Sequence, residues 1–483
     1  MRRLILMGAS CIVLIAMFFL LHTPSFERIP PSIELYVLKE NDKTPHHIHT
    51  AFFNPNNDIH LSAFDSSGLA SYKVSITDKM GKVLLEEDEI LLKKTEELNI
   101  VLPKIPDLPN GDEVFYHVSV RDWSNANFFR GNEASITKHF IINKSTPQIQ
   151  VIAASEQIMY GGSALVAFSI KQLDIYNKAK ESSIDKVIIS NGKDDFEAYP
   201  FINKQGRIVY LALIAWPIKN TFFDGTIRVI DSAMNEKKIQ IPIATNVNYP
   251  RRKFNMNMSD MRLQTLIRRL EKNTIIPQDL TTNIEKFQFF NESLRYQENQ
   301  KISNFFQISK QTNTESSIPR FNVFAPVRDA QTSGRFGDEY TYKYHKEYVG
   351  VSVRYGVEFI GEQDTKVINS NNGILVYSGN IGSYGNLAAI NHAFGLTALY
   401  GYLNKIPTLQ TQLQSLMPIG EMGSSGFANA NSLFFAILVQ GHFVNPNEWL
   451  QAQWVNDNIN QVLDKADNFG MRHISYTIEK EHY

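Results

Sequence analysis

Hydrophobic and polar residues alternate over short runs through most of the first half of the chain. Four of these runs read SYKVSIT, FYHVSVRD, SALVAFSIK and GTIRVID, and turn clusters such as NPNND, PNGD and SNGKDD separate the runs. Alternation with a period of two, interrupted by turn residues, is typical of β-strands that bury one face. The pattern therefore predicts an all-β region over residues 31–245.

The periodicity changes to helical after residue 246. Ser259 is a suitable N-cap, and apolar residues at helical spacing follow it at Leu263, Leu266, Ile267 and Leu270. A second helical pattern begins at TNIEKF and continues to about residue 307. Arg268 and Arg269, on the first of these helices, fit a solvated helix face at least as well as an anion site. Glycine-punctuated β-strands return from about residue 319 to 450.

The N-terminal segment has a different character. Arg2 and Arg3 precede an uncharged apolar run from Leu4 to Leu21. A bilayer core needs roughly 17–25 such residues, so this run is long enough to span it. The positive charges predict that the N-terminus stays in the cytoplasm and that the bulk of the chain is exported. A cleaved signal peptide is the alternative. The only cysteine, Cys11, lies in the middle of this run, which argues against a lipoprotein signal and excludes an intrachain disulfide.

Length and charge narrow the range of functions. With 483 residues the chain is too long for a single core, so several domains are expected. A formal net charge of −1 argues against a broad surface for nucleic acid.

The all-β region contains two copies of one pattern. SVRDWSNANFF and RVIDSAMNEKK each place an Asp and a polar turn after a strand. These phrases resemble bacterial immunoglobulin-like repeats, which implies two sandwiches that serve as spacers or adhesive modules. Asp65, Asp122 and Asp231 are candidate calcium ligands, and turn capping by their side chains is the alternative.

The last third of the chain carries a second and more specific resemblance. Residues 371–406 contain, in order, a G-x-x-V-x-x-G strand, then YGN with INH, then G-x-T-x-x-Y-x-Y-L. Farther on, GSSG, an NSLFF strand and NPNEWL follow. This order of motifs resembles the LytM (lysostaphin-like) family of zinc peptidases, which cleave peptidoglycan. The resemblance implies an antiparallel β domain of the LytM type.

In that family, zinc is held by the His and Asp of an H-x-x-x-D motif and by the second His of an H-x-H motif, while two further histidines assist the reaction. The Tyr-Gly-Val at residues 355–357 sets the register of the first motif in this chain. All five positions then depart from the family's pattern, because they are occupied by Arg354, Glu358, Tyr402, Ser432 and Phe434.

These substitutions remove the chemistry that zinc needs. A guanidinium has no lone pair to give to a metal, and a phenyl ring has no donor atom. One carboxylate, from Glu358, does not hold zinc, so neither a catalytic site nor bound zinc is expected. His392, His345 and His442 are the nearest candidate replacements, and we expect none of them to rebuild the site. The four-residue spacing predicts instead that Arg354 and Glu358 form an ion pair, partly exposed in the groove.

The sequence thus predicts a mostly β protein with six segments. They are an anchor (1–24), two immunoglobulin-like sandwiches (31–143 and 144–245), a helical connector (246–318), the LytM-type domain (319–450) and a C-terminal helix and tail (451–483).

The predicted function is non-enzymatic regulation or scaffolding of peptidoglycan hydrolysis, in the periplasm at the inner membrane. Expected partners are peptidoglycan or its peptide stems, an active LytM paralogue or an amidase, and the membrane through residues 4–21. The alternatives are an active zinc endopeptidase with an unusual ligand set and an envelope spacer or adhesion protein.

Overall fold

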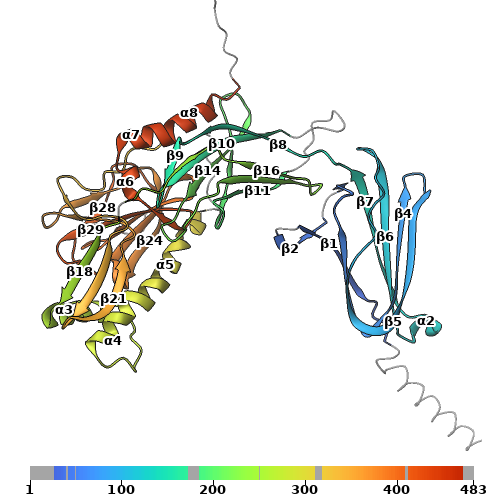
Figure 1. The fold of residues 1–483 in the computed structure, drawn as a ribbon, viewed down its shortest axis with the longest axis horizontal. Helices are drawn as coiled ribbons and strands as arrows, with labels where there is room; N and C mark the ends of the chain where they lie inside the picture. The colour runs from blue at the N-terminus through green and yellow to red at the C-terminus, as the bar shows by residue number, and fades with distance from the viewer. Residues whose placement is uncertain are drawn as a thin grey trace, which may run out of the picture. The chain divides into compact units, whose positions relative to one another are not determined.

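A computed structural model describes residues 27–39, 42–48, 51–171, 184–249, 251–309, 318–407 and 412–470. This part of the chain is mostly β, as the sequence predicts (Figure 1). It divides into two compact units. The first comprises Met1–Gln148, Gln172–Lys186 and Val229–Lys237, and the second comprises Ile149–Lys171, Val187–Arg228 and Lys238–Tyr483.

The first unit is built on a seven-stranded sheet of order β2-β1-β4-β6-β7-β3, with β5 paired to β4. In β4, buried and less buried residues alternate along the strand, and Leu61, Val74 and Ile76 belong to its core. The strands predicted as the first sandwich are therefore hydrogen-bonded in one sheet, and their resemblance to immunoglobulin-like repeats stays a prediction. The strands are β1 (Ser32–Lys39), β2 (Asp42–His47), β3 (Phe52–Phe53), β4 (Ile59–Asp78), β5 (Val83–Val101), β6 (Glu113–Asp122) and β7 (Glu133–Ile142).

Two four-stranded sheets follow, of order β13-β14-β10-β8 and β12-β11-β15-β16. Strands β10 and β14 are almost entirely buried, which explains why SALVAFSIK and IVYLALIA read as near-continuous apolar runs. The strands are β8 (Gln148–Ala154), β10 (Ser163–Lys171), β11 (Ile184–Ser190), β12 (Asp195–Glu197), β13 (Tyr199–Ile202), β14 (Ile208–Ala215), β15 (Thr226–Asp231) and β16 (Glu236–Gln240). A short parallel pair joins β9 (Gln157–Met159) to β17 (Ala244–Asn246).

The C-terminal β domain contains an eight-stranded sheet of order β19-β22-β29-β26-β25-β24-β27, with β30 paired to β29. Strand β29 is buried along its whole length, so it forms the centre of the domain. These strands are β19 (Gln331–Gly334), β22 (Val357–Ile360), β24 (Gly373–Ile381), β25 (Gly385–Asn391), β26 (Leu396–Gly401), β27 (Gln412–Leu413), β29 (Ser432–Val439) and β30 (His442–Val444). Two smaller sheets combine β18 (Lys253–Met258) with β20 (Glu339–Tyr344) and β21 (Glu347–Val353), and β23 (Lys366–Ile368) with β28 (Pro418–Glu421).

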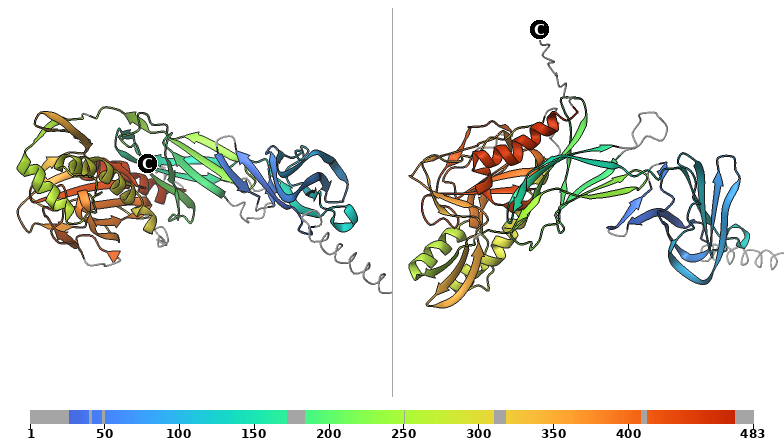
Figure 2. Two further views of the ribbon diagram at one scale, coloured as in Figure 1. Left: turned by 90° about the horizontal axis from the view of Figure 1, so that it is seen from below. Right: turned by 45° about the horizontal axis from the view of Figure 1, so that its top comes forward.

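The helices of residues 260–303 pack against this domain. Ser259 caps α3 (Asp260–Glu271), as the sequence predicts, by accepting a hydrogen bond from the Arg262 amide at 3.3 Å. Helix α4 (Asn283–Gln288) continues through a π-helical turn into α5 (Arg295–Ser303). Leu263, Ile267 and Phe287 share a hydrophobic cluster with Val349 of β21. Figures 1 and 2 show these yellow-green helices against the orange strands, so the segment predicted as a connector covers part of the C-terminal domain.

Buried polar contacts also join the C-terminal domain to strand β10. The Glu448 carboxylate, in α6 (Pro446–Trp449), accepts a hydrogen bond from the Ser163 amide at 3.0 Å, and the Trp449 indole donates to the Ser163 hydroxyl at 3.1 Å. A Cβ on Gly162 would lie 2.2 Å from Glu448 Oε1, so this close approach requires glycine. Two short helical segments follow, α7 (Ala452–Trp454) and α8 (Gln461–Asp467), and the side-chain amide of Asn203 binds the carbonyl of Ala466 at 3.0 Å.

The predicted anchor, residues 4–21, lies outside the described residues. Within the ranges that the structure describes, no helix is long and apolar enough to cross a bilayer.

Burial makes the Glu448 contact sensitive to pH. Burial raises the pKa of Glu448 to about 8, against the smaller opposing effect of the Ser163 hydrogen bonds. Between about pH 4.5 and about pH 8, Glu448 keeps its proton in the folded protein and loses it in the unfolded chain. The free energy of unfolding therefore falls as the pH rises through this range. Glu448→Gln should remove this dependence, which has a slope of at most about 1.4 kcal/mol per pH unit. Urea unfolding of both proteins at pH 5, 6.5 and 8 measures it. The exposed Glu347→Gln is the control, and parallel curves for Glu448→Gln and the unmodified protein would contradict the prediction.

Candidate functional site

The sheet register gathers four of the five family site positions. Glu358 of β22 lies directly opposite Phe434 of β29, and Phe434 lies opposite Gly401, next to Tyr402. Arg354 follows the end of β21 and contacts Glu358. The fifth position, Ser432, is fully buried and donates its hydroxyl hydrogen bond to the Ala430 carbonyl at 3.1 Å.

Arg354 and Glu358 form an ion pair through Nη1 and Oε2, which confirms the pairing that their spacing predicts. The pair is more buried than the sequence suggested, with side-chain exposures of 16% for Arg354 and 7% for Glu358. Burial lowers the pKa of Arg354, but the Glu358 carboxylate and the nearby Tyr402 and Tyr340 hydroxyls outweigh it and raise the pKa above its usual value. The guanidinium therefore stays charged.

Neighbouring residues hold the guanidinium in place. Arg354 Nη2 donates to the Tyr340 hydroxyl at 3.3 Å, and the guanidinium carbon lies 5.1 Å from the centre of the Tyr340 ring. A Cβ on Gly334 would lie 2.6 Å from Arg354 Nε, so the arginine occupies space that only glycine leaves open. The cation thus has a carboxylate on one side and an aromatic face on another, an arrangement suited to a permanent charge.

Phe434 fills the position of the second family histidine with an aromatic cluster. Its ring centre lies 5.1 Å from that of Tyr384 and 5.6 Å from that of Tyr402. A Cβ on Gly356 would lie 2.6 Å from the Phe434 ring, so the backbone is in direct contact with it. Phe434 is therefore part of the hydrophobic core, in one cluster with Tyr384 and Tyr402.

A cleft of about 540 Å³ opens beside this cluster, between α3, β20 and the loop after β28. Its lining is rich in arginine and tyrosine, and also includes methionine and phenylalanine. Among the lining residues are Arg269, Arg295, Arg354, Tyr340, Tyr384, Tyr402, Phe427 and Phe434.

Arg269 is a residue of this cleft that sequence reasoning missed. The sequence suggested a solvated helix face, and Arg268 is indeed exposed. Arg269, in contrast, is half-buried and donates to the carbonyls of Gly426 and Ala428. Burial lowers the pKa of Arg269. The signal available in the sequence was its helical spacing: Arg269 lies three residues after Leu266 and shares a helix face with that apolar side chain, which also lines the cleft.

The three candidate replacement histidines lie in three different places. None of them lines the cleft. His392 is buried with its Nδ1 2.7 Å from the Asn372 carbonyl, and burial lowers the pKa of His392 to about 4. His345 is exposed 3.7 Å from Asp260, and His442 lies 4.0 Å from Asp194. The structure therefore does not bring these histidines together at one point.

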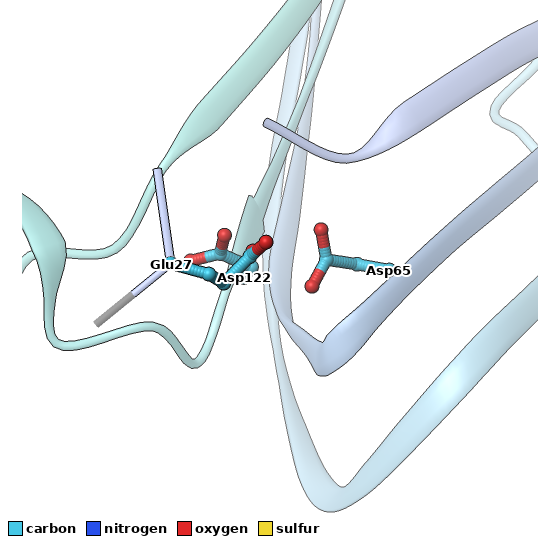
Figure 3. A group of neighbouring side chains, drawn as sticks. All are labelled: Glu27, Asp65 and Asp122. Carbon is cyan, nitrogen blue, oxygen red and sulfur yellow. The ribbon is translucent and has the colours of Figure 1, made fainter. Parts of the chain in front are cut away.

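The acidic candidates of the first unit act as turn caps. Asp65, Asp122 and Glu27 have carboxylate oxygens within 4.8 Å of one another (Figure 3). Asp122 accepts hydrogen bonds from the amides of Ser124 and Asn132, and Asp65 accepts one from Ser67. Burial and the neighbouring carboxylates Glu27 and Asp122 raise the pKa of Asp65.

Asp231 lies in another turn, apart from that group. It accepts hydrogen bonds from the Ala233 and Asn235 amides at 2.9 and 2.8 Å. The capping alternative is thus confirmed at all three aspartates, and calcium binding remains untested.

Comparison with known proteins assigns the domain that holds the cleft. Residues 352–446 match peptidase family M23. The chain therefore carries a peptidase M23 (LytM-type) domain in its C-terminal part, as the sequence predicts.

Relatives match the same part of the chain. The DD-carboxypeptidase/endopeptidase Mpg of Neisseria meningitidis is 29% identical over 126 residues, which cover 26% of this chain and 28% of Mpg. The murein hydrolase activator EnvC of Escherichia coli is 30% identical over 133 residues, which cover 27% of this chain and 30% of EnvC. The chain thus spans less than a third of the length of each relative.

Among solved structures, a peptidase M23 protein from Pseudomonas aeruginosa is 13% identical, with a TM-score of 0.33 over 61% of this chain and 95% of that one. The catalytic domain of lysostaphin from Staphylococcus simulans is 22% identical, with a TM-score of 0.22 over 25% of this chain and 92% of that one.

The energetic coupling of the central ion pair can be measured directly. Arg354→Met or Glu358→Gln alone leaves one buried charge unpaired, so each should lower the free energy of unfolding by about 3–5 kcal/mol. The double variant should cost clearly less than the sum, because it leaves no unpaired charge. A double-mutant cycle by urea unfolding measures this coupling. The exposed pair Arg320–Asp464, treated with the same substitution types, is the control and should show coupling below about 1 kcal/mol. Additive effects at Arg354 and Glu358 would contradict the prediction.

Proposed function

We propose that this protein is a non-enzymatic regulator or scaffold of peptidoglycan hydrolysis, held at the inner membrane with its bulk in the periplasm. The observation that carries the proposal is the Arg354–Glu358 ion pair at the position where the family holds zinc. A buried cation already balances the only carboxylate among the five site positions. A divalent metal at the same place would have to displace the Arg354 guanidinium.

The residues at the site do not fit zinc. Catalytic zinc takes three protein ligands and keeps one position for water. Arg354 and Phe434 offer no lone pair, and the hydroxyl of Ser432 is engaged with Ala430. No nucleophile-generating step can be assigned to such a site, so we derive no hydrolytic step for it.

The cleft supports a role in binding. Arginine and tyrosine line it together, and these residues carry hydrogen-bond donors and aromatic faces that suit a peptide with carboxylate groups. Peptide stems of peptidoglycan and an extended segment of a partner protein both have this chemistry. The relatives named above, a DD-carboxypeptidase/endopeptidase and a murein hydrolase activator, support a place in cell-wall hydrolysis without deciding between the two roles.

The non-enzymatic role predicts a protein without zinc. Purified protein loaded with excess zinc and then desalted should retain no stoichiometric zinc by elemental analysis, and it should release no fragments from purified peptidoglycan. Arg354→His with Glu358→Asp should still be inactive, because Phe434 denies the third protein ligand. One zinc per chain, together with cleavage that a chelator abolishes and zinc restores, would establish the endopeptidase alternative instead.

The binding role predicts a partner that occupies the cleft. Tagged protein should capture an amidase or a LytM-type peptidase from the envelope, and adding the purified protein should change the rate at which that enzyme digests peptidoglycan. Met261→Glu, on the exposed rim of the cleft, should abolish both effects, while Met80→Glu in the other unit should not. Binding that survives Met261→Glu and is lost on removal of the N-terminal sheet would favour the spacer alternative.

A further inference from the structure

The connection between β6 and β7, residues 123–131, includes the four-residue α2 (Ala126–Phe129) and exposes three aromatic side chains. We call it the aromatic loop. Trp123 is 48% exposed, Phe128 is 96% exposed and Phe129 is 75% exposed. Leaving a phenylalanine in water rather than burying it costs about 1.5–3 kcal/mol. Two adjacent phenylalanines held outward in this way mark a surface that contacts an apolar phase or a partner.

The loop holds these side chains in an unfavourable backbone conformation. Asn127, Phe128 and Phe129 have φ angles of 52°, 60° and 68°, in the left-handed region. Such angles cost roughly 1–2 kcal/mol per residue. Asp122 restrains the loop, because its Oδ1 accepts hydrogen bonds from the amides at both ends, Ser124 at 2.9 Å and Asn132 at 2.7 Å. The fold therefore maintains the exposure of Phe128 and Phe129.

The same loop is attached to the chain that follows the apolar N-terminal run. The Ser124 hydroxyl donates to the Glu27 carbonyl at 2.7 Å, and the Asn132 side-chain amide donates to the same carbonyl at 3.1 Å. Figure 3 shows Glu27 beside Asp122 at this point. Glu27 is six residues after Leu21, the end of the apolar run. A fully extended chain of that length spans at most about 21 Å, so the loop has to stay close to the place where that run ends.

We propose that the aromatic loop inserts into the headgroup region of the membrane that anchors the chain. This proposal rests on the membrane anchor proposed above. Trp favours the boundary between headgroups and acyl chains because its ring is apolar with a polar N–H, and Phe side chains bury their apolar rings at the same depth.

The charges around the loop favour an apolar attachment to lipid over an electrostatic one. Arg130 belongs to the loop, Arg28 follows Glu27 in the chain, Arg121 is paired with Glu133 at 2.8 Å, and Glu27 lies beside Asp65 and Asp122. Acidic and basic groups are therefore nearly balanced, and binding through the rings should depend only weakly on salt.

The test uses the full-length protein in vesicles of phosphatidylethanolamine and phosphatidylglycerol. Cys11→Ser removes the only native cysteine, and single cysteines replace Phe128 or, as the matched control, Met80. Each carries an environment-sensitive fluorophore. Met80 is 85% exposed, and it follows Asp78, which pairs with Val114 at the far end of β6 from Asp122. Val114 and Asp122 are eight positions apart along β6, which separates the two sites by about 26 Å.

The expected result is a blue-shifted emission and several-fold stronger quenching by spin-labelled lipid at position 128 than at position 80, in low and high salt alike. If the protein floats with the vesicles but both probes report water, the loop proposal is overturned while the anchor stands. If the protein does not float with the vesicles, the anchor itself is wrong. Equal quenching at both positions also overturns the proposal, because it shows general surface adsorption.

A label-free measurement guards against an effect of the fluorophore. Brominated lipid should quench the fluorescence of the unmodified protein more than that of Trp123→Phe, because Trp216 and Trp449 are buried and Trp454, which is only partly exposed, is present in both proteins. Phe128→Ser together with Phe129→Ser should remove the difference. Equal quenching of the unmodified protein and Trp123→Phe would contradict insertion of the loop.

Discussion

A buried guanidinium has to be paired, and this constraint organises the C-terminal domain. Removing Arg354 from water is costly, and only a carboxylate at contact distance offsets that cost. Glu358 supplies it from β22, four residues along the chain. The pair in turn sets what surrounds it. Gly334 has to be free of a Cβ, Tyr340 offers its ring and hydroxyl, and Phe434 occupies the place opposite Glu358. The residues at these positions are thus compatible with one another in charge and in the space that they occupy.

The cleft beside this cluster is assembled from segments that are distant in sequence. Helix α3 contributes Arg269, which binds carbonyls of the loop at 426–428. Helix α5 contributes Glu298, whose carboxylate accepts a hydrogen bond from the Ser383 amide at 3.1 Å. Burial raises the pKa of Glu298, against the opposing effect of the Ser383 hydrogen bonds. Helix α3 thus holds a loop of the cleft through a half-buried guanidinium and α5 through a buried carboxyl group, which makes both helices structural parts of the site.

The sequence was informative where a local pattern determines the structure. The Tyr-Gly-Val register placed Arg354 and Glu358 in contact, alternation identified the strands, and Ser259 was found as a helix cap. The sequence was less informative about burial, which depends on packing between residues that are distant in sequence. The burial of Arg269 depends on a loop some 160 residues away, and the burial of the Arg354–Glu358 pair depends on Tyr340 and Phe434. The pairing of residues 32–142 in one sheet is likewise set by register between distant strands, which no local periodicity encodes. The resemblance to immunoglobulin-like repeats and the segment boundaries drawn from the sequence remain predictions for the same reason.

Under the proposed function, the cluster also bears on how such a domain can remain folded without a metal. A zinc ligand set carries unbound donors in the empty state, and part of its stability comes with the ion. Here the charges neutralise each other within the chain, and the Phe434, Tyr384 and Tyr402 rings pack together in the adjoining core. Under the proposed function, the fold is then independent of metal supply, and its groove stays available at any zinc concentration. Selection on such a domain would act on the shape and chemistry of the cleft rather than on a reaction. The buried charges at the site are already balanced by residues of the protein itself.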